Sequence, residues 1–185
     1  MPPILIKGPK IPYVKRTAAA DDAFDVKKIK LPVGVELTGG SKLRKNGLTG
    51  KGVRVHVIDS GVDDTHPGFG GKITKQLWFR YGTDLSEDDH GTHVAGTIHM
   101  LAPDAEILDY RFFGTEGDVD AEHAISASFF EACSDGCNVI NMSLGGRWPN
   151  ASIRTAVRYA HSKGVVIVCA AGNEGDGNSM INEIR

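Results

Sequence analysis

Three polar residues in this 185-residue sequence are suited to proton transfer and charge stabilisation: Asp59, His90 and Asn173. A carboxylate beside an imidazole holds the ring in one tautomer and stabilises the imidazolium that forms when the ring takes a proton. An amide in a glycine-flanked turn, such as Asn173 in AAGNEGDG, can donate hydrogen bonds to a developing oxyanion. These residue types therefore indicate general acid–base chemistry with an oxyanion donor.

Each of these residues also has an ordinary structural interpretation. Asp59 can be a turn residue that accepts backbone hydrogen bonds, and Asn173 can be selected for its tolerance of left-handed turn geometry. His90 can begin a helix with Asp89 as the N-cap, whose side chain would satisfy an unbonded amide. Taken one at a time, the residues leave both interpretations open.

The segment DDHGTHVAG, residues 88–96, contains a second histidine and two glycines. We expect His93, one turn after His90, to be a packing residue. Gly91 and Gly96 each cost up to about 1 kcal/mol in a helix. Close approach by another backbone is the expected reason for both glycines.

A metal-dependent hydrolase is the alternative raised by a group of oxygen and nitrogen donors: Asp59, Asp63, Asp64, His66, His90 and His93. However, HGTH lacks the HExxH spacing that puts two histidines one turn apart with a base between them. The three cysteines form no paired CxxC motifs, so a structural zinc site is not expected either. The sequence predicts no metal and no cofactor.

The apolar pattern of the chain alternates between strands and helices. Runs typical of strands are VRVHVID (53–59), EILDYRFF (106–113), NVINMS (138–143) and GVVIVCAAG (164–172), three of them typical of strands buried on both faces. Stretches typical of helices lie between them, at residues 90–100, 118–133 and 150–164. Asn150 would cap the last helix and Gly164 would end it. This alternation indicates βαβ units and a mainly parallel sheet.

In such a sheet the reactive groups collect beyond the carboxyl ends of the strands. Asp59 closes the first strand, Ser143 closes the third, Asn173 follows the fourth, and His90 begins a helix after a loop. We therefore expect all four at one rim. The glycines of SLGG, residues 143–146, can leave backbone groups open to pair with an extended peptide. An ordinary exit from a strand is the alternative.

The composition of the whole chain excludes several kinds of partner. A length of 185 residues with 41% hydrophobic content predicts one globular domain. The net charge of -2 creates no field that would gather nucleic acid or an anionic membrane. No stretch approaches the ~18 apolar residues that span a bilayer. The absence of a signal-like apolar run and the sparse cysteines predict a cytoplasmic or otherwise intracellular protein, unless a leader has been removed.

Taken together, the motifs resemble the subtilisin-like serine proteases, the subtilases. The matching segments occur in the family's order between about residues 47 and 177: GLTGKGVRVHVIDSGVDDTHPGF, DDHGTHVAGTI, LAPDAEI, NVINMSLGG and GVVIVCAAGNEGDG. Several motifs in one order are more specific than any one of them. The resemblance implies a three-layer α/β subtilisin-like fold and a serine endopeptidase that cleaves polypeptides by acyl transfer.

The resemblance also implies roles for individual residues. The triad aspartate, the triad histidine and the side-chain donor of the oxyanion hole would be Asp59, His90 and Asn173. The strand beside the specificity pocket would contain Ser143, Leu144 and Gly145. A second strand flanking the substrate would contain Gly117, Asp118 and Val119, although the last two depart from the small residues common there.

The nucleophile of the family is not found in this sequence. No GTSMA-like motif follows Asn173, and Ser179 in GNSMIN lies only six positions later, without the preceding Thr. We therefore interpret residues 34–185 as the N-terminal part of a subtilase peptidase domain, in which activity without the serine falls by about a million-fold, as in subtilisin. The alternative is an inactive fragment or pseudoprotease that binds peptides or a complementing C-terminal half.

Two further segments bear on regulation and metal binding. His99, Met100 and Leu101 run almost directly into LAPDAEI, where many relatives insert ligands for a structural calcium, so no calcium is expected. KIPYV, residues 10–14, resembles a segment near the start of intracellular subtilisins that can lie across the active-site cleft. Residues 1–33 are thus either an inhibitory extension or a flexible tail.

Overall fold

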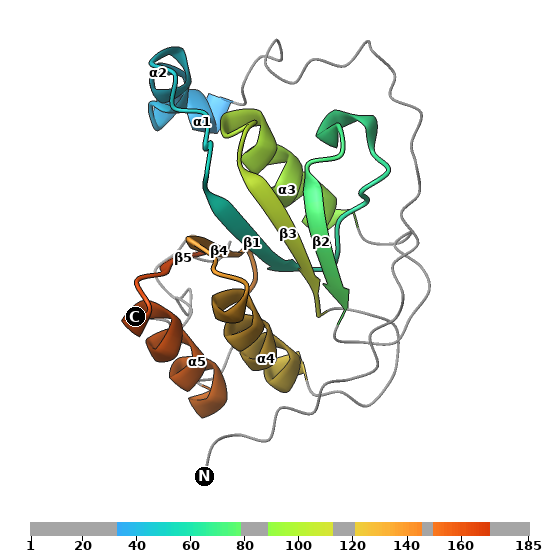
Figure 1. Cartoon of the computed structure of the whole chain (residues 1–185), viewed down its shortest axis with the longest axis vertical. Helices are drawn as coiled ribbons and strands as arrows, with labels where there is room; N and C mark the ends of the chain where they lie inside the picture. The colour runs from blue at the N-terminus through green and yellow to red at the C-terminus, as the bar shows by residue number, and fades with distance from the viewer. Residues whose placement is uncertain (1–32, 79–88, 113–120, 146–149, 171–185) are drawn as a thin grey trace, which may run out of the picture.

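A computed structural model describes residues 33–78, 89–112, 121–145 and 150–170 of the chain. They form one five-stranded sheet in the order β2-β3-β1-β4-β5, and every strand pair in it is parallel. Helices cover both faces of the sheet (Figure 1). The three-layer α/β fold with a mainly parallel sheet, expected from the sequence, is confirmed.

The element bounds follow the predicted pattern closely. The strands are β1 (Arg54–Asp59), β2 (Ile73–Trp78), β3 (Glu106–Arg111), β4 (Val139–Met142) and β5 (Val166–Cys169). The helices are α1 (Val33–Leu37), α2 (Gly40–Lys45), α3 (His90–Leu101), α4 (Ala121–Ser134) and α5 (Ala151–Ser162), with a 3-10 turn, η2 (Pro67–Phe69). All four predicted strands and all three predicted helices are present. Strand β2 and helices α1 and α2 were not predicted.

Local capping explains where α5 begins and ends. The side chain of Asn150 accepts a hydrogen bond of 2.9 Å from the amide of Ile153, which satisfies one of the first unbonded N–H groups of the helix. Gly164 has φ of 80°, the left-handed conformation that follows many helix ends. Both predicted boundary residues of this helix are confirmed.

The alternation of side chains along the central strands divides the core in two. Val57 of β1 and Ile107 of β3 point toward α3, whereas Ile58 and Leu108 point toward α4 and α5. Because α3 precedes β3 on one face while α4 follows β3 on the other, the chain changes faces at β3, which lies next to β1 in the sheet. Ligands of parallel α/β sheets bind at the carboxyl end of the strands at such a switch point.

The edge strand β5 departs from the expectation of burial on both faces. Ile167 packs against the core next to α5, but Val166 and Val168, on the opposite face, are 57% and 48% exposed. Strands β1 and β3, in contrast, are buried on both faces after their first residue. Among the described residues, the face of β5 that carries Val166 and Val168 is therefore apolar and exposed.

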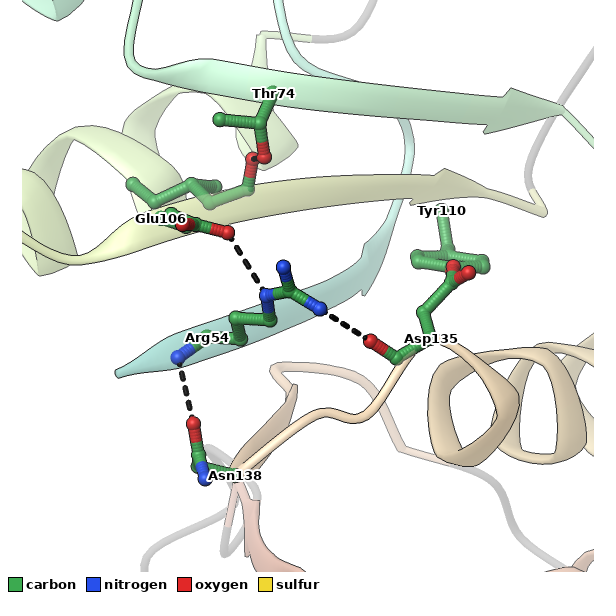
Figure 2. Close-up of polar contacts among 7 residues, drawn as sticks. Arg54, Thr74, Glu106, Tyr110, Asp135 and Asn138 are labelled. Carbon is green, nitrogen blue, oxygen red and sulfur yellow. Dashed lines mark hydrogen bonds and ion pairs between the residues drawn. The ribbon is translucent and has the colours of Figure 1, made fainter. Parts of the chain in front are cut away.

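Arg54 holds together the amino ends of the central elements (Figure 2). Its amide donates to Oδ1 of Asn138 at 2.8 Å, its Nε donates to Oε2 of Glu106 at 2.9 Å, and its Nη1 donates to the carbonyl of Asp135 at 2.8 Å. The half-exposed ion pair with Glu106 adds little free energy. The contacts do align β1, β3 and β4 at their amino ends.

None of the helices in these four described ranges is long and apolar enough to cross a membrane. The predicted extension, residues 1–33, lies outside the described residues except for Val33, with which α1 begins.

His99 is a buried titratable group between α3 and η2. It is 3% exposed, its ring lies 5.9 Å from that of Phe69, and its Nδ1 has no hydrogen-bond partner in the described part of the chain. Burial lowers the pKa of His99 below its usual 6.5, and the positive charge of Lys72 lowers it further, with Asp104 opposing and Arg44 adding to the decrease. Folding thus favours the neutral form of this ring.

We predict that His99 makes the protein less stable in acid. Its contribution to the free energy of unfolding is present above pH about 6.5 and is lost as the pH falls toward the lowered pKa, because the unfolded chain then binds the extra proton. His99→Leu should reduce the loss of stability between pH 7 and pH 5, measured by urea unfolding. The control His161→Leu should leave the loss unchanged, since that side chain is exposed on α5. An equal pH dependence in parent and His99→Leu would contradict the prediction.

Candidate active site

The carboxylate of Asp59 and the imidazole of His90 meet at the carboxyl end of β1. His90 Nδ1 lies 2.7 Å from Asp59 Oδ1, which is the distance of a charge-assisted hydrogen bond. The Asp59 side chain is 1% exposed, whereas that of His90 is 51% exposed. The predicted proximity of these two residues, 31 positions apart in the chain, is confirmed.

The backbone of β1 holds Asp59 in place. The carbonyl of Asp59 accepts a hydrogen bond of 3.1 Å from Phe112, which continues the ladder to β3. Oδ1 also accepts a bond of 2.8 Å from the amide of Ser60, so it has two donors. In the described residues Oδ2 has no partner. Arg111 is the Cα partner of Asp59 in β3 and is also buried. A positively charged residue therefore lies beside Asp59 in the neighbouring strand.

The contact with Asp59 sets the tautomer of His90. An ionised carboxylate can only accept hydrogen bonds, so Nδ1 must be the donor. In the neutral ring, Nε2 is then the acceptor, and the side chain that carries it is half exposed. This is the arrangement of a general base whose ring is oriented by a carboxylate.

Ser60 caps the first turn of α3. Asp89 occupies the N-cap position but makes no side-chain hydrogen bond to the helix, so the alternative interpretation, in which its side chain caps the helix, is wrong. The Oγ of Ser60 instead accepts a bond of 3.0 Å from the amide of Gly91. The unbonded amide at this helix start is thus satisfied from the loop that follows β1.

The two glycines of α3 differ. A Cβ on Gly91 would collide with the carbonyl oxygen of Gly61 and lie 3.0 Å from the carbonyl carbon and amide nitrogen of that residue. The predicted close approach of another backbone is therefore confirmed for Gly91. It is wrong for Gly96, where no atom lies within 4 Å of the added Cβ.

His93 is exposed on α3, so the prediction that it packs in the core is wrong. Its position one turn from His90 places it on the helix surface, away from the apolar side chains such as Ala95 that face the sheet. The buried histidines of the described chain are His56 in β1 and His99 at the other end of α3.

The segment after β4 lies at the same rim. Asn141 and Val57 are partners in the β4–β1 register, so continuing that register leads from Asn141 to Ser143 beside the end of β1. The Oγ of Ser143 accepts a hydrogen bond of 2.9 Å from Nδ2 of Asn141. Leu144 packs against the core, whereas Gly145 is exposed.

The other residues predicted for the site lie outside the described residues: Asn173, Gly117, Asp118, Val119 and Ser179. Within the described ranges, no three His, Cys, Asp or Glu side chains form a group that could hold a metal ion.

Three residues that the sequence did not single out contribute to the site. Ser60 and Thr92 connect the loop after β1 to α3, and the Oδ2 of Asp109 accepts a hydrogen bond of 3.1 Å from the amide of Val62 in that loop. Asp109 is fully buried in β3. The signal for Asp109 was present in the sequence, since a carboxylate in a strand buried on both faces requires a local donor.

The cysteines are unsuited to act as nucleophiles. Cys133, Cys137 and Cys169 are free thiols. Burial raises the pKa of all three, that of Cys137 to about 12. Because the thiolate is the reactive form, these side chains are less reactive at neutral pH than an ordinary cysteine.

Comparison with known proteins identifies the family of this chain. The model of the Subtilase family matches residues 50–183. The chain belongs to the subtilase family. Among subtilases, it is 32% identical to the major intracellular serine protease of Bacillus subtilis (strain 168), over 94% of this chain and 57% of that protein.

Other subtilisin-like proteins are similar to this subtilase chain. Subtilisin E of the same Bacillus strain is 34% identical, over 95% of this chain and 47% of that protein. The crystal structure of a lanthipeptide protease matches with a TM-score of 0.63 and 29% identity, over 74% of this chain and 44% of that one. The chain therefore spans about half the length of the curated relatives it matches, and the predicted family and fold are confirmed.

The close approach at Gly91 leads to a paired prediction. Gly91→Ala should lower the free energy of unfolding by about 1–3 kcal/mol, because neither backbone can move away without disturbing the other. Gly96→Ala on the same helix should raise it by up to about 1 kcal/mol, because the helix gains propensity without a clash. Urea unfolding monitored by circular dichroism measures both. A Gly91→Ala protein as stable as Gly96→Ala would contradict the packing described.

Proposed function

We propose that this chain supplies the acid–base pair of a serine endopeptidase that cleaves polypeptides by acyl transfer. The observation that carries the proposal is the 2.7 Å contact between His90 Nδ1 and the buried Oδ1 of Asp59 at the carboxyl end of β1. Membership of the subtilase family supports the same chemistry.

In the proposed mechanism, a serine hydroxyl attacks the carbonyl carbon of the scissile peptide. Nε2 of His90 takes the hydroxyl proton and later gives it to the leaving amine. The carboxylate of Asp59 keeps the ring in the Nδ1–H tautomer and stabilises the imidazolium between these two steps. Asn173 donates a hydrogen bond to the oxyanion of the tetrahedral intermediate. Water then hydrolyses the acyl-enzyme by the same route.

The substrate would lie in extended conformation between two segments. We propose residues 143–145 on one side, where exposed Gly145 leaves the backbone open to pair with a peptide, and Gly117, Asp118 and Val119 on the other. The packing of Leu144 against the core supports this, because it would keep the edge of the segment rigid.

The serine itself is proposed to come from a segment outside these 185 residues. The sequence contains no GTSMA-like motif, and the curated relatives are about twice as long as this chain. The intracellular location, and the absence of nucleic-acid and membrane partners, remain predictions from the sequence.

A fluorophosphonate probe, which reacts covalently with activated serines, tests the proposal. The 185-residue chain alone should remain unlabelled. A chimera in which the C-terminal remainder of the Bacillus subtilis intracellular protease follows this chain should be labelled and should hydrolyse a peptide substrate. In that chimera, Asp59→Asn should lower kcat by about ten-thousandfold, and Asn173→Ala by about a hundredfold to a thousandfold.

Glu106→Gln provides the matched control, since this carboxylate lies at the opposite end of the sheet. It should leave kcat of the chimera unchanged. Labelling of the unmodified 185-residue chain would refute the proposed location of the serine. The proposed acid–base pair would be refuted if the chimera folds and binds peptide but Asp59→Asn leaves its activity unchanged.

The second candidate function is that of a binding chain without activity of its own. The observation that favours it is the open face of β5, where Val166 and Val168 are about half exposed. Exposed apolar side chains of this kind mark surfaces that other chains cover. We propose that a complementing C-terminal segment of a subtilase binds there.

Titration of the chain with the isolated C-terminal remainder of the Bacillus subtilis relative tests this binding. The double variant Val166→Ser, Val168→Ser should bind about tenfold or more weakly, because each valine contributes on the order of 1 kcal/mol when buried. Val33→Ser, at an exposed valine of α1, is the matched control and should not change the affinity. Equal affinity for the double variant and the control would exclude β5 as the binding surface.

A further inference from the structure

The loop after β1, residues 60–63, is joined to the first turn of α3, residues 90–92, by two reciprocal hydrogen bonds. The amide of Gly91 donates to Oγ of Ser60 at 3.0 Å, and the amide of Asp63 donates to Oγ1 of Thr92 at 2.9 Å. Each segment thus provides one hydroxyl and one backbone N–H. We refer to this pair of bonds as the loop–helix contact.

Close backbone packing lies between these two bonds. Gly61 has φ of 109°, which glycine adopts readily, and its carbonyl occupies the place where a side chain on Gly91 would be. From the sheet side, the buried Oδ2 of Asp109 accepts the amide of Val62. The loop is therefore held at three successive residues after Ser60, and the position of the helix start follows from the position of the loop.

The loop–helix contact sits next to both members of the acid–base pair. Ser60 follows Asp59 directly and donates its own amide to Asp59 Oδ1. Gly91 and Thr92 follow His90 directly. Because the His90 side chain is 51% exposed, the sheet core does not fix its ring, and the 2.7 Å bond to Asp59 depends on where the helix begins.

We propose that Ser60 and Thr92 are positioning residues, whose hydroxyls hold His90 Nδ1 at Asp59 Oδ1 through the loop–helix contact. The inference rests on the proposed function for its catalytic meaning. A displacement of about 1 Å between reacting groups costs on the order of a hundredfold in rate. Two hydroxyl groups that accept hydrogen bonds from backbone amides would in this way control the position of the base.

The ring nitrogens of His90 report the position of the ring without requiring activity. In the full 185-residue chain labelled with nitrogen-15, NMR measures the ratio of Nδ1–H to Nε2–H tautomer of the neutral ring. Thr92→Val keeps the shape of the side chain and removes the acceptor for Asp63. It should lower this ratio about fivefold, the effect of losing one hydrogen bond, and Ser60→Ala should act in the same direction.

Three controls separate positioning from general loss of structure. Thr92→Ser restores the hydroxyl and should return the ratio to within about twofold of the parent, since the hydrogen bond is regained. Thr97→Val removes the hydroxyl that donates to the carbonyl of His93 on the same helix and should leave the ratio unchanged. The resonances of buried His99 should be the same in all variants, which shows that α3 remains folded.

The outcomes distinguish this inference from the proposed function. If Asp59→Asn abolishes the preference for Nδ1–H while Thr92→Val and Ser60→Ala leave it intact, the positioning role is refuted and the acid–base pair stands. The positioning role is also refuted if Thr97→Val lowers the ratio as much as Thr92→Val. If Asp59→Asn leaves the tautomer ratio of His90 unchanged, the acid–base pair itself is refuted, and the positioning role is refuted with it.

Discussion

The structure of the site depends on burying the Asp59 carboxylate at the end of β1. A charged group taken out of water costs several kcal/mol unless hydrogen bonds replace its hydration. Here the replacement comes from the amide of Ser60 and the imidazole of His90, both at Oδ1. The carboxylate is thereby a fixed acceptor, and a half-exposed histidine is the group that completes its environment.

That constraint determines how α3 must approach the sheet. Strand β1 supplies Asp59 and α3 supplies His90, so the helix has to begin within hydrogen-bonding distance of the strand end. A side chain at position 91 would keep the helix backbone away from the loop after β1. Glycine at this position removes the obstacle, and Gly96, five residues along the same helix, has no comparable neighbour. Glycine therefore permits close backbone packing at position 91, whereas position 96 has no such packing.

The opposite end of the sheet is organised by different interactions. Arg54 joins β1 to Glu106 of β3 through an ion pair between side chains, and to Asp135 and Asn138 around the start of β4 through two hydrogen bonds that each pair a backbone group with a side chain (Figure 2). These bonds align the amino ends of the strands, whereas the acid–base pair lies at the carboxyl end of β1. Rigid alignment at one end leaves the other end free to be specialised for chemistry, as is usual for parallel sheets.

The sequence by itself determined the alternation of strands and helices and the subtilase motifs, because apolar period, capping residues and motif order are local properties. The pairing of Asp59 with His90, 31 positions apart, was predicted from those motifs and from the rule that reactive groups collect beyond the carboxyl ends of parallel strands. The sequence did not reveal β2, whose ITKQLW contains three polar residues at the edge of the sheet, and it misplaced His93. Only the tertiary structure decided that Ser60, and not Asp89, caps α3, and that Thr92 bonds to Asp63. The physical reason is that these hydrogen bonds join residues about thirty positions apart, and such contacts exist only after the sheet has brought the two segments together.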